Sequence, residues 1–330
     1  MPELPSAARA ELEARFGAFC SFNESARNFT TYRAGGPAAA LVKPADAAEF
    51  AWLAACCRRH GLPLLTLGRG SNVLVSDLGL GGVTALTERL DRLDFSGNAV
   101  KAQAGVLWDD LARLTAGKGL AGLEKTSGIP GSVGGAVRMN AGAFGQETFD
   151  RLISVEALDP AGEIVVLPKS GLPHGYRRVG GLDGLILLAA EFEFGTGPAA
   201  ALLAERDRVL AARAAKQPLD LPSAGSVFKR PPGDYASRLI DAAGLKGLRL
   251  GGAQVSARHA GFIVNAGGAT AADIYGLMRK VHAEVEARTG TVMTAVGGAV
   301  SKMTEVPTPE GILAARAPNS TLPALSVDLE

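Results

Sequence analysis

The sequence predicts an α+β protein divided into several modules, and three observations support this. The chain has 330 residues, which is more than a single hydrophobic core usually serves. Residues 40–67 carry the pattern of a strand, a helix and a second strand. A hairpin pattern over 153–167 is followed by two long helical patterns, at 198–216 and 270–288.

The first module is assigned to residues 1–81 and begins with a short amphipathic helix that we expect to cover its surface. Asp46 and Glu49 are spaced as a capping box, and the helix that follows should end near Gly61. Residues 62–67 then read as a buried strand, followed by a tight polar turn and another strand.

Two further modules and a tail follow, at 82–197, 198–303 and 304–330. The second is expected to contain strands near Val83 and Ala99, a helix over 108–117, the hairpin 153–158 with 163–167, and a last strand over 185–194. The third is expected to contain a bridging helix over 198–216, helices over 235–243 and 270–288, and strands near Val227 and 262–264. The tail has four prolines and no apolar period, which predicts disorder.

Composition excludes several classes of protein. The chain is 47% hydrophobic and 20% charged, with a net charge of +1 and no basic run, so neither nucleic acid nor an anionic membrane is an expected partner. The longest apolar run, 185–190, is too short to span a bilayer, and no signal peptide pattern is present. Three cysteines disfavour a disulfide framework, and with four scattered histidines they lack zinc-ligand spacing. We expect a reduced, metal-free protein of the cytoplasm.

The chain is organised around a glycine-rich stretch, residues 126–145, in which six of twenty residues are glycine and only Arg138 is charged. It retains apolar residues such as Ile129 and Phe144, which favours a buried, ordered loop over a linker. Exposed N–H groups in such a loop suit a pyrophosphate. The alternative is a glycine-rich turn without a ligand.

A second glycine loop, Gly-Arg-Gly-Ser-Asn at 68–72, is a weak signal alone, since a turn between strands needs nothing more. It is not the dinucleotide fingerprint of a Rossmann fold, because no helix pattern follows it directly. Two such loops on successive modules nevertheless suggest a dinucleotide cofactor held between the modules.

Two short motifs carry candidate catalytic groups. Arg177 beside Tyr176 could clamp a carboxylate or phosphate, although a solvated arginine is the simpler interpretation. Ser226 begins an apolar strand pattern followed by Lys229 and Arg230, and it could donate a proton to a substrate carbanion. Its alternative is a turn or cap residue. No His or Asp lies nearby in sequence to make it a hydrolytic nucleophile.

A polar set further along the chain could line a sugar-nucleotide pocket, or could equally be the hydrated surface of an α+β module. Its members are Lys246, Arg249, Gln254, Arg258, His259 and Asn265.

Together, these motifs resemble the bacterial UDP-N-acetylenolpyruvoylglucosamine reductases, also called UDP-N-acetylmuramate dehydrogenases, from about residue 28 to residue 288. The matching stretches are 30–37, 68–72, 127–131, 139–142, 176–177, 222–226, 228–229 and 245–265. The short interval between Arg177 and Ser226 is similar to the compact variant of the family, which lacks an extra substrate-covering loop.

The resemblance implies a two-module FAD-binding domain of the vanillyl-alcohol-oxidase-like type and a C-terminal α+β substrate domain. It also implies a flavoprotein of peptidoglycan synthesis with non-covalent FAD. The sequence does not fix the oligomeric state, and we expect a monomer. NADPH would be the reductant, and UDP-N-acetylglucosamine enolpyruvate the substrate, reduced to UDP-N-acetylmuramate. In such an enzyme Ser226 gives the proton, while Arg177 and a C-terminal glutamate stabilise the intermediate.

The resemblance also assigns binding residues. Substrate binding falls to Tyr176, Lys229, Lys246, Gln254 and His259. FAD binding falls to Tyr32, Arg33, Gly68, Arg69, Gly70, Ser71, Asn72, Gly128, Ile129, Pro130, Gly131, Ser132, Gly134, Gly135, Asn140 and Ala141.

The chain departs from the family pattern after its last long helix. The family has Leu-Glu-Pro-Glu-Val a few residues after a glycine, whereas this chain continues from Gly290 as Thr-Val-Met-Thr-Ala-Val, so the glutamate position falls on Val296. Val179 also stands where a serine commonly follows the Tyr-Arg pair. One alternative is therefore a flavin- or UDP-sugar-binding paralogue with weak or lost turnover. Another is an FAD oxidase of a different alcohol or sugar, which is disfavoured because neither glycine loop offers His or Cys for covalent attachment.

Overall fold

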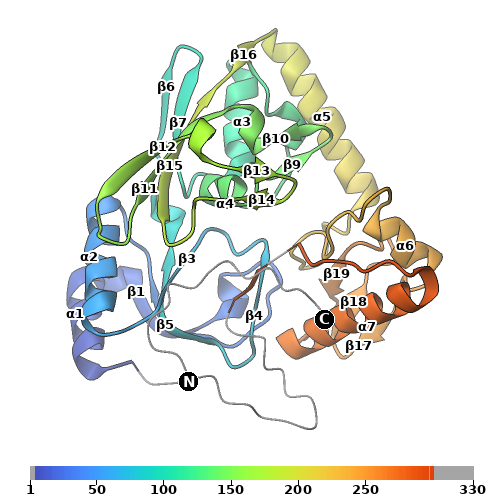
Figure 1. Cartoon of the computed structure of the whole chain (residues 1–330), viewed down its shortest axis with the longest axis horizontal. Helices are drawn as coiled ribbons and strands as arrows, with labels where there is room; N and C mark the ends of the chain where they lie inside the picture. Colours follow the sequence, from blue (N-terminus) through green and yellow to red (C-terminus); the bar gives the residue numbers. More distant parts are fainter. Residues whose placement is uncertain (1–3, 297, 301–330) are drawn as a thin grey trace.

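The computed structural model describes residues 4–296 and 298–300 and is organised around two larger β-sheets and one three-stranded sheet (Figure 1). The helices are α1 (Ser6–Phe16), α2 (Ala47–Arg59), α3 (Trp108–Gly117), α4 (Val133–Arg138), α5 (Ala199–Lys216), α6 (Ala236–Ala242) and α7 (Ala271–Thr289). The strands of the three sheets are β1 (Cys20–Ser25), β2 (Pro37–Val42), β3 (Leu64–Leu67), β5 (Leu80–Leu86), β6 (Leu93–Ser96), β7 (Ala99–Gln103), β11 (Leu152–Leu158), β12 (Ile164–Pro168), β15 (Ile186–Glu193), β17 (Arg249–Leu250), β18 (Ala253–Val255) and β19 (Ile263–Asn265). Short paired strands complete the fold: β4 (Val73–Val75) with β20 (Gly298–Val300), β8 (Leu120–Ala121) with β16 (Gly195–Thr196), β9 (Gly142–Ala143) with β10 (Gln146–Glu147), and β13 (His174–Gly175) with β14 (Arg178–Val179).

The first sheet has the strand order β1-β2-β5-β3. The predicted strand–helix–strand unit is present as β2, α2 and β3, but its two strands do not pair with each other, because both pair in parallel with β5. β5 lies inside this sheet, between β2 and β3, and its residues Val83 and Ala85 have no exposed surface. The predicted boundary between residues 81 and 82 therefore falls inside a central strand, and the pairing assigns residues up to Leu86 to the first sheet.

The capping signal for α2 acts nearly as predicted. The Asp46 side chain accepts the N–H of Glu49, whereas the Glu49 carboxylate accepts the N–H of Ala45 instead of the N–H of Asp46. α1 lies against α2 (Figure 1), with the ring of Phe16 edge-on to Trp52 at 5.6 Å between centroids. The first helix thus covers the helical face of the first sheet, as its apolar spacing predicted.

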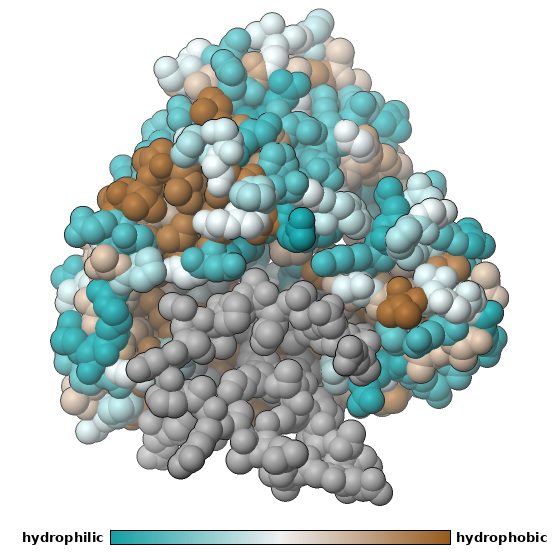
Figure 2. Space-filling view, in the orientation of Figure 1, coloured by the Kyte–Doolittle hydropathy of each residue, from teal (hydrophilic) through white to brown (hydrophobic). Residues whose placement is uncertain are grey.

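The second sheet is antiparallel, in the order β12-β11-β15-β7-β6, and it confirms the predicted hairpin and last strand. Trp108 opens α3 and is fully buried against Phe192, with 6.0 Å between ring centroids. Along the edge strand β12, Ile164 and Val166 are exposed, and hydrophobic residues gather over β11 and β12 in Figure 2.

The third unit packs α6 and α7 on the sheet β17-β18-β19 and is joined to the second by α5 (Figure 1). α7 begins at a capping box between Thr270 and Asp273 and ends at Gly290 with φ +69°, within one residue of the helix predicted over 270–288. The strand predicted near Val227 is present only as two isolated β-bridges outside the sheets. Ser226 pairs with Phe262, and Phe228 pairs with Ala295. The predicted tail lies outside the described residues. No helix in the described ranges is long and apolar enough to cross a bilayer.

A polar seam joins the first and third units. Both carboxylate oxygens of Asp77 accept N–H groups at the start of α7, from Ala271 and Ala272, each at 2.8 Å. From the other side, the Asn265 amide donates to the carbonyl of Tyr32 at 3.0 Å. The Tyr32 ring is itself part of the hydrophobic core of the third unit. These contacts fix the third unit on the first, in addition to the connection through α5.

We predict that Asp77→Ala lowers the free energy of unfolding by about 1–2 kcal/mol, because two N–H groups at a helix N-terminus lose their charged acceptor. Urea unfolding followed by far-UV circular dichroism measures the loss. Asp91→Ala, at an exposed aspartate with no hydrogen-bond partner within the described part of the chain, is the control. Equal stability of the two variants would contradict the role given to Asp77.

Candidate active site

The first glycine loop connects β3 to β4 and lies against residues 29–31. Thr31 donates its N–H to the carbonyl of Gly70 at 3.1 Å. Gly70 has φ +59°, and a Cβ there would lie 2.3 Å from the carbonyl oxygen of Phe29. Within the described ranges, the N–H groups of residues 68–71 donate to no other protein group. The loop is therefore held through its carbonyl side while its donors remain available.

The second glycine loop runs into α4 and is held by α3 and by the segment that follows β7. Gly128 donates its N–H to the carboxylate of Asp109 at 2.7 Å, and the N–H of Trp108 bonds to the carbonyl of Gly131 at 3.0 Å. The N–H of Gly134 bonds to the carbonyl of Ala104 in the same way. Both ends of the stretch are thus fixed, and this is an ordered loop as predicted.

The two loops meet. The Ser71 hydroxyl donates to the carbonyl of Pro130 at 3.1 Å. A Cβ on Gly68 would lie 2.3 Å from the hydroxyl oxygen of Ser132 and 4.0 Å from that of Thr87. Both hydroxyls are buried and have no hydrogen-bond partner among the residues that the structure describes. Unpartnered buried hydroxyls beside available N–H groups match the donor set that a pyrophosphate requires.

The remaining residues predicted for FAD occupy varied positions. Tyr32 packs in the hydrophobic core of the third unit, and this burial raises the pKa of its phenol. Arg33 is exposed with φ +50°, and Arg69 lies 3.8 Å from the carboxylate of Glu88. On the two glycine loops the structure places Asn72, Ile129, Pro130, Gly135 and Ala141.

The Asn140 side chain, which was predicted to bind FAD, makes three hydrogen bonds within the protein. Its side chain is already fully used: the amide donates to Glu147 at 2.7 Å and to the carbonyl of Gly175 at 3.2 Å, and its oxygen accepts the N–H of Phe149. The residue has no exposed surface. These bonds connect the Asn140 side chain to the start of the 175–177 segment and help to hold that segment in place.

Arg177 lies directly beside this loop. Its guanidinium donates to the backbone carbonyls of Asn140 at 3.2 Å and Gly142 at 2.6 Å, and the residue has φ +55°. Half-exposed Tyr176 lies next to it, with 5.2 Å between the guanidinium and the ring centroid. The pair predicted from sequence is therefore anchored to the end of the second glycine loop.

The segment that follows Ser226 in the third unit comes close to this pair. The guanidinium of Arg230, four residues further on, lies 5.7 Å from the Tyr176 ring, so the two segments are neighbours. Ser226 is exposed, and Lys229 donates its N–H to the carbonyl of Thr294 at 2.7 Å. The N–H of Val296 bonds to the carbonyl of Val227 at 2.8 Å. Position 296 thus lies on a segment paired with the residues that follow Ser226.

The predicted polar pocket is only partly assembled. Lys246 lies near His259, and burial first, then Lys246 and Lys216, lower the pKa of the His259 imidazole. Gln254 instead pairs with Arg249, at 3.3 Å. Two further members turn away to structural bonds: Arg258 donates to the Gln217 carbonyl, and Asn265 joins the seam at Tyr32.

Two buried arginines of α5 were not among the site residues predicted from the sequence. Arg206 donates to Asp109 at 2.6 Å, and this is the carboxylate that also holds the N–H of Gly128. Arg213 lies against Gly128 as well, because a Cβ there would be 2.9 Å from the Arg213 Cδ. Both side chains are over 90% buried, and each has a nitrogen without a partner in the described residues. Their spacing of seven, on one face of an alanine-rich helix, was the available signal.

Comparison with known proteins defines the class first. A model of the FAD-binding domain matches residues 38–168, which cover both glycine loops, so the chain is an FAD-dependent oxidoreductase. A model of the C-terminal domain of UDP-N-acetylenolpyruvoylglucosamine reductase matches residues 217–295.

The family follows from full-length relatives. UDP-N-acetylenolpyruvoylglucosamine reductase of Alkalilimnicola ehrlichii is 47% identical over 82% of this chain and 91% of that protein. The enzyme of Lactococcus lactis subsp. cremoris is 41% identical over the same shares. The crystal structure of the Thermus caldophilus reductase superposes with a TM-score of 0.73 and 34% identity, covering 85% of this chain and 97% of that one. The chain belongs to the UDP-N-acetylenolpyruvoylglucosamine reductase family, and the predicted fold class and family are confirmed.

We predict that Asn140→Ala leaves FAD bound but weakens the reaction with the enolpyruvyl substrate at least about tenfold, since Arg177 and the 175–177 segment lose their support. Stopped-flow absorbance separates flavin reduction by NADPH from reoxidation by substrate. Glu147→Gln, which keeps an acceptor for the Asn140 amide, is the control. Loss of FAD from the purified Asn140→Ala protein would show that the residue serves the cofactor instead.

Proposed function

We propose that this protein reduces UDP-N-acetylglucosamine enolpyruvate to UDP-N-acetylmuramate, with FAD and NADPH, as a monomer in the cytoplasm. The reaction would supply peptidoglycan precursors, and through them cell shape and division. The observation that carries the proposal is the meeting of the two glycine loops around buried, unpartnered hydroxyls, with Arg177 held at the end of the second loop.

FAD, when bound, would accept hydride from NADPH and deliver it to the enolpyruvyl double bond. The donors at 68–71, with the hydroxyls of Ser132 and Thr87, suit its pyrophosphate. The Asp109 carboxylate, fixed by Arg206, would keep the Gly128 loop in shape beneath the cofactor. These assignments give FAD a mainly backbone-lined cradle, consistent with non-covalent binding.

Ser226 is the proposed proton donor, and Arg177 the proposed electrostatic partner of the substrate. Addition of hydride leaves a carbanion beside the substrate carboxylate, which is stabilised as an enolate and takes one proton to form product. The guanidinium of Arg177 would offset this developing negative charge, and Tyr176 would help to hold the substrate. Preorganised donors of this kind are worth about 3–4 kcal/mol each in the transition state.

Of the other proposed substrate residues on the third unit, Lys229 and Lys246 supply positive charge, whereas the lowered pKa of His259 favours its neutral imidazole, which can donate one hydrogen bond. Lys229 follows Ser226 on the same segment, and Lys246 and His259 lie near one another further along that unit. Such groups suit the diphosphate of a UDP-sugar. Gln254, paired with Arg249, would have to change partner to take part.

We predict that Ser226→Ala binds FAD and is reduced by NADPH at close to the parent rate, but reoxidises with substrate about 10²–10⁴-fold more slowly, since the positioned proton is lost. Single-turnover absorbance follows both half-reactions. A variant that reoxidises as fast as the parent would remove Ser226 from the mechanism.

The segment that carries Val296 pairs with residues 227–229, so a longer acidic side chain at position 296 would be placed near Ser226. We predict that Val296→Glu raises turnover with substrate and leaves flavin reduction by NADPH unchanged. Val296→Gln, similar in size but uncharged, is the control and should give no gain. If both variants behave alike, a carboxylate at 296 has no catalytic role in this chain.

A further inference from the structure

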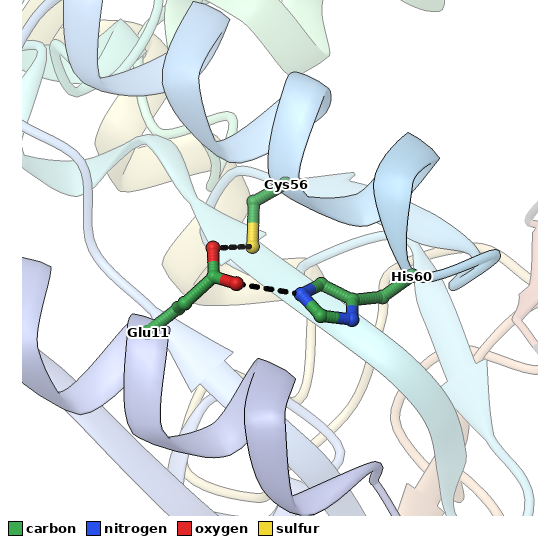
Figure 3. A group of neighbouring side chains, drawn as sticks. All are labelled: Glu11, Cys56 and His60. Carbon is green, nitrogen blue, oxygen red and sulfur yellow. Dashed lines mark hydrogen bonds and ion pairs between the residues drawn. The ribbon is translucent and has the colours of Figure 1, made fainter.

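Three metal-ligating side chains meet between α1 and α2, on elements that form neither glycine loop. Figure 3 shows Glu11 of α1 facing Cys56 and His60, which lie one turn apart along α2 and its C-terminal cap. The Glu11 carboxylate is 3.7 Å from the Cys56 sulfur through one oxygen and 2.9 Å from His60 Nε2 through the other. One ligand atom from each residue lies within 4.8 Å of the others.

These separations are close to those around a tetrahedral zinc ion. Bonds of about 2.0 Å to nitrogen and oxygen and about 2.3 Å to sulfur place ligand atoms roughly 3.3–3.5 Å apart. The observed distances of 3.7 and 2.9 Å run to different oxygens of the Glu11 carboxylate. One ligand atom from each of the three residues lies within 4.8 Å of the others, so a cation that binds there would draw these atoms about 1 Å closer together. A carboxylate, an imidazole and a thiolate also form a donor set that zinc accepts.

The charges around these three side chains permit a cation to bind. Arg59 donates to the same Glu11 oxygen that faces Cys56, but its side chain is half exposed and can shift toward solvent. An ion pair to a ligating carboxylate is also a common outer-shell contact, because it fixes the carboxylate's orientation. Cys57, the adjacent thiol, is buried but is not part of the group, so the cluster distinguishes between two neighbouring cysteines.

We propose that Glu11, Cys56 and His60 form a binding site for a divalent transition-metal cation of the zinc class, with a water molecule as fourth ligand. The Cys56 thiol gives up its proton to solvent when the cation binds, and His60 offers the Nε2 lone pair while keeping its proton on Nδ1. The bound cation links the first helix to α2. The sequence predicted no metal because its Cys and His residues lack zinc-ligand spacing. Glu11, which completes the group, lies 45 residues before Cys56.

The test uses the untagged, FAD-containing protein with Co²⁺ alone as a spectroscopic probe. We expect one equivalent to produce a thiolate-to-metal charge-transfer band in the near ultraviolet, which zinc then removes by displacement. The band should persist in Cys57→Ser and be lost in Cys56→Ser. His60→Gln should weaken Zn²⁺ binding at least about tenfold in competition with a chromophoric chelator.

The same measurements can overturn the site. Absence of the band in the parent, or a band of equal intensity in Cys56→Ser, shows that no thiolate is bound. Should Cys56→Ser lose its fold or its FAD, His60→Gln at a more exposed position decides, and unchanged Zn²⁺ affinity there rejects the proposal. Neither substitution touches the residues proposed for catalysis, so failure of the metal site leaves the reductase assignment intact.

Discussion

The two glycine loops depend on glycine at positions 68 and 70, where a side chain would not fit. A Cβ on Gly68 would lie 2.3 Å from the Ser132 hydroxyl, and one on Gly70 would lie 2.3 Å from the carbonyl of Phe29. Each loop is held by segments next to a different sheet, so this close approach also connects the two sheets. The cofactor site is therefore a property of the contact between sheets, and neither sheet could form it alone.

The same contact extends to the third unit. Thr31 bonds to the carbonyl of Gly70, and the next residue, Tyr32, places its ring in the third unit's core while its carbonyl accepts from Asn265. Asp77 adds a charged acceptor at the start of α7. A short, continuous set of bonds thus runs from the cofactor loop to the unit that carries Ser226. Side chains from two separate folding units can be held in register only through such a set.

Much of the fold could be predicted because its signals lie in short stretches of the sequence. The cap at Thr270, the stop at Gly290 and the hairpin of β11 and β12 follow from spacing and turn chemistry, and the family motifs located both glycine loops. What the sequence could not predict depends on contacts between distant residues. The insertion of β5 between β2 and β3 is one example, and the commitment of the Asn140 side chain to Glu147 and Gly175 is another. Hydrogen-bond partners 35 residues apart leave no periodic signal.

The valine at position 296 has a narrow consequence. Its place is set by main-chain pairing with residues 227–229, which any side chain permits, so the exchange of glutamate for valine leaves the local fold intact. Among the described residues, the hydrogen bonds that hold the glycine loops do not involve Val296, so we expect cofactor binding to be independent of it. In the proposed mechanism, what changes is the charge near Ser226, because an aliphatic side chain can neither accept a proton nor orient a hydroxyl. The electrostatic work at the substrate then rests on Arg177 and the lysines of the third unit. The half-reaction with substrate is consequently the step in which this chain should differ from relatives that retain the acid.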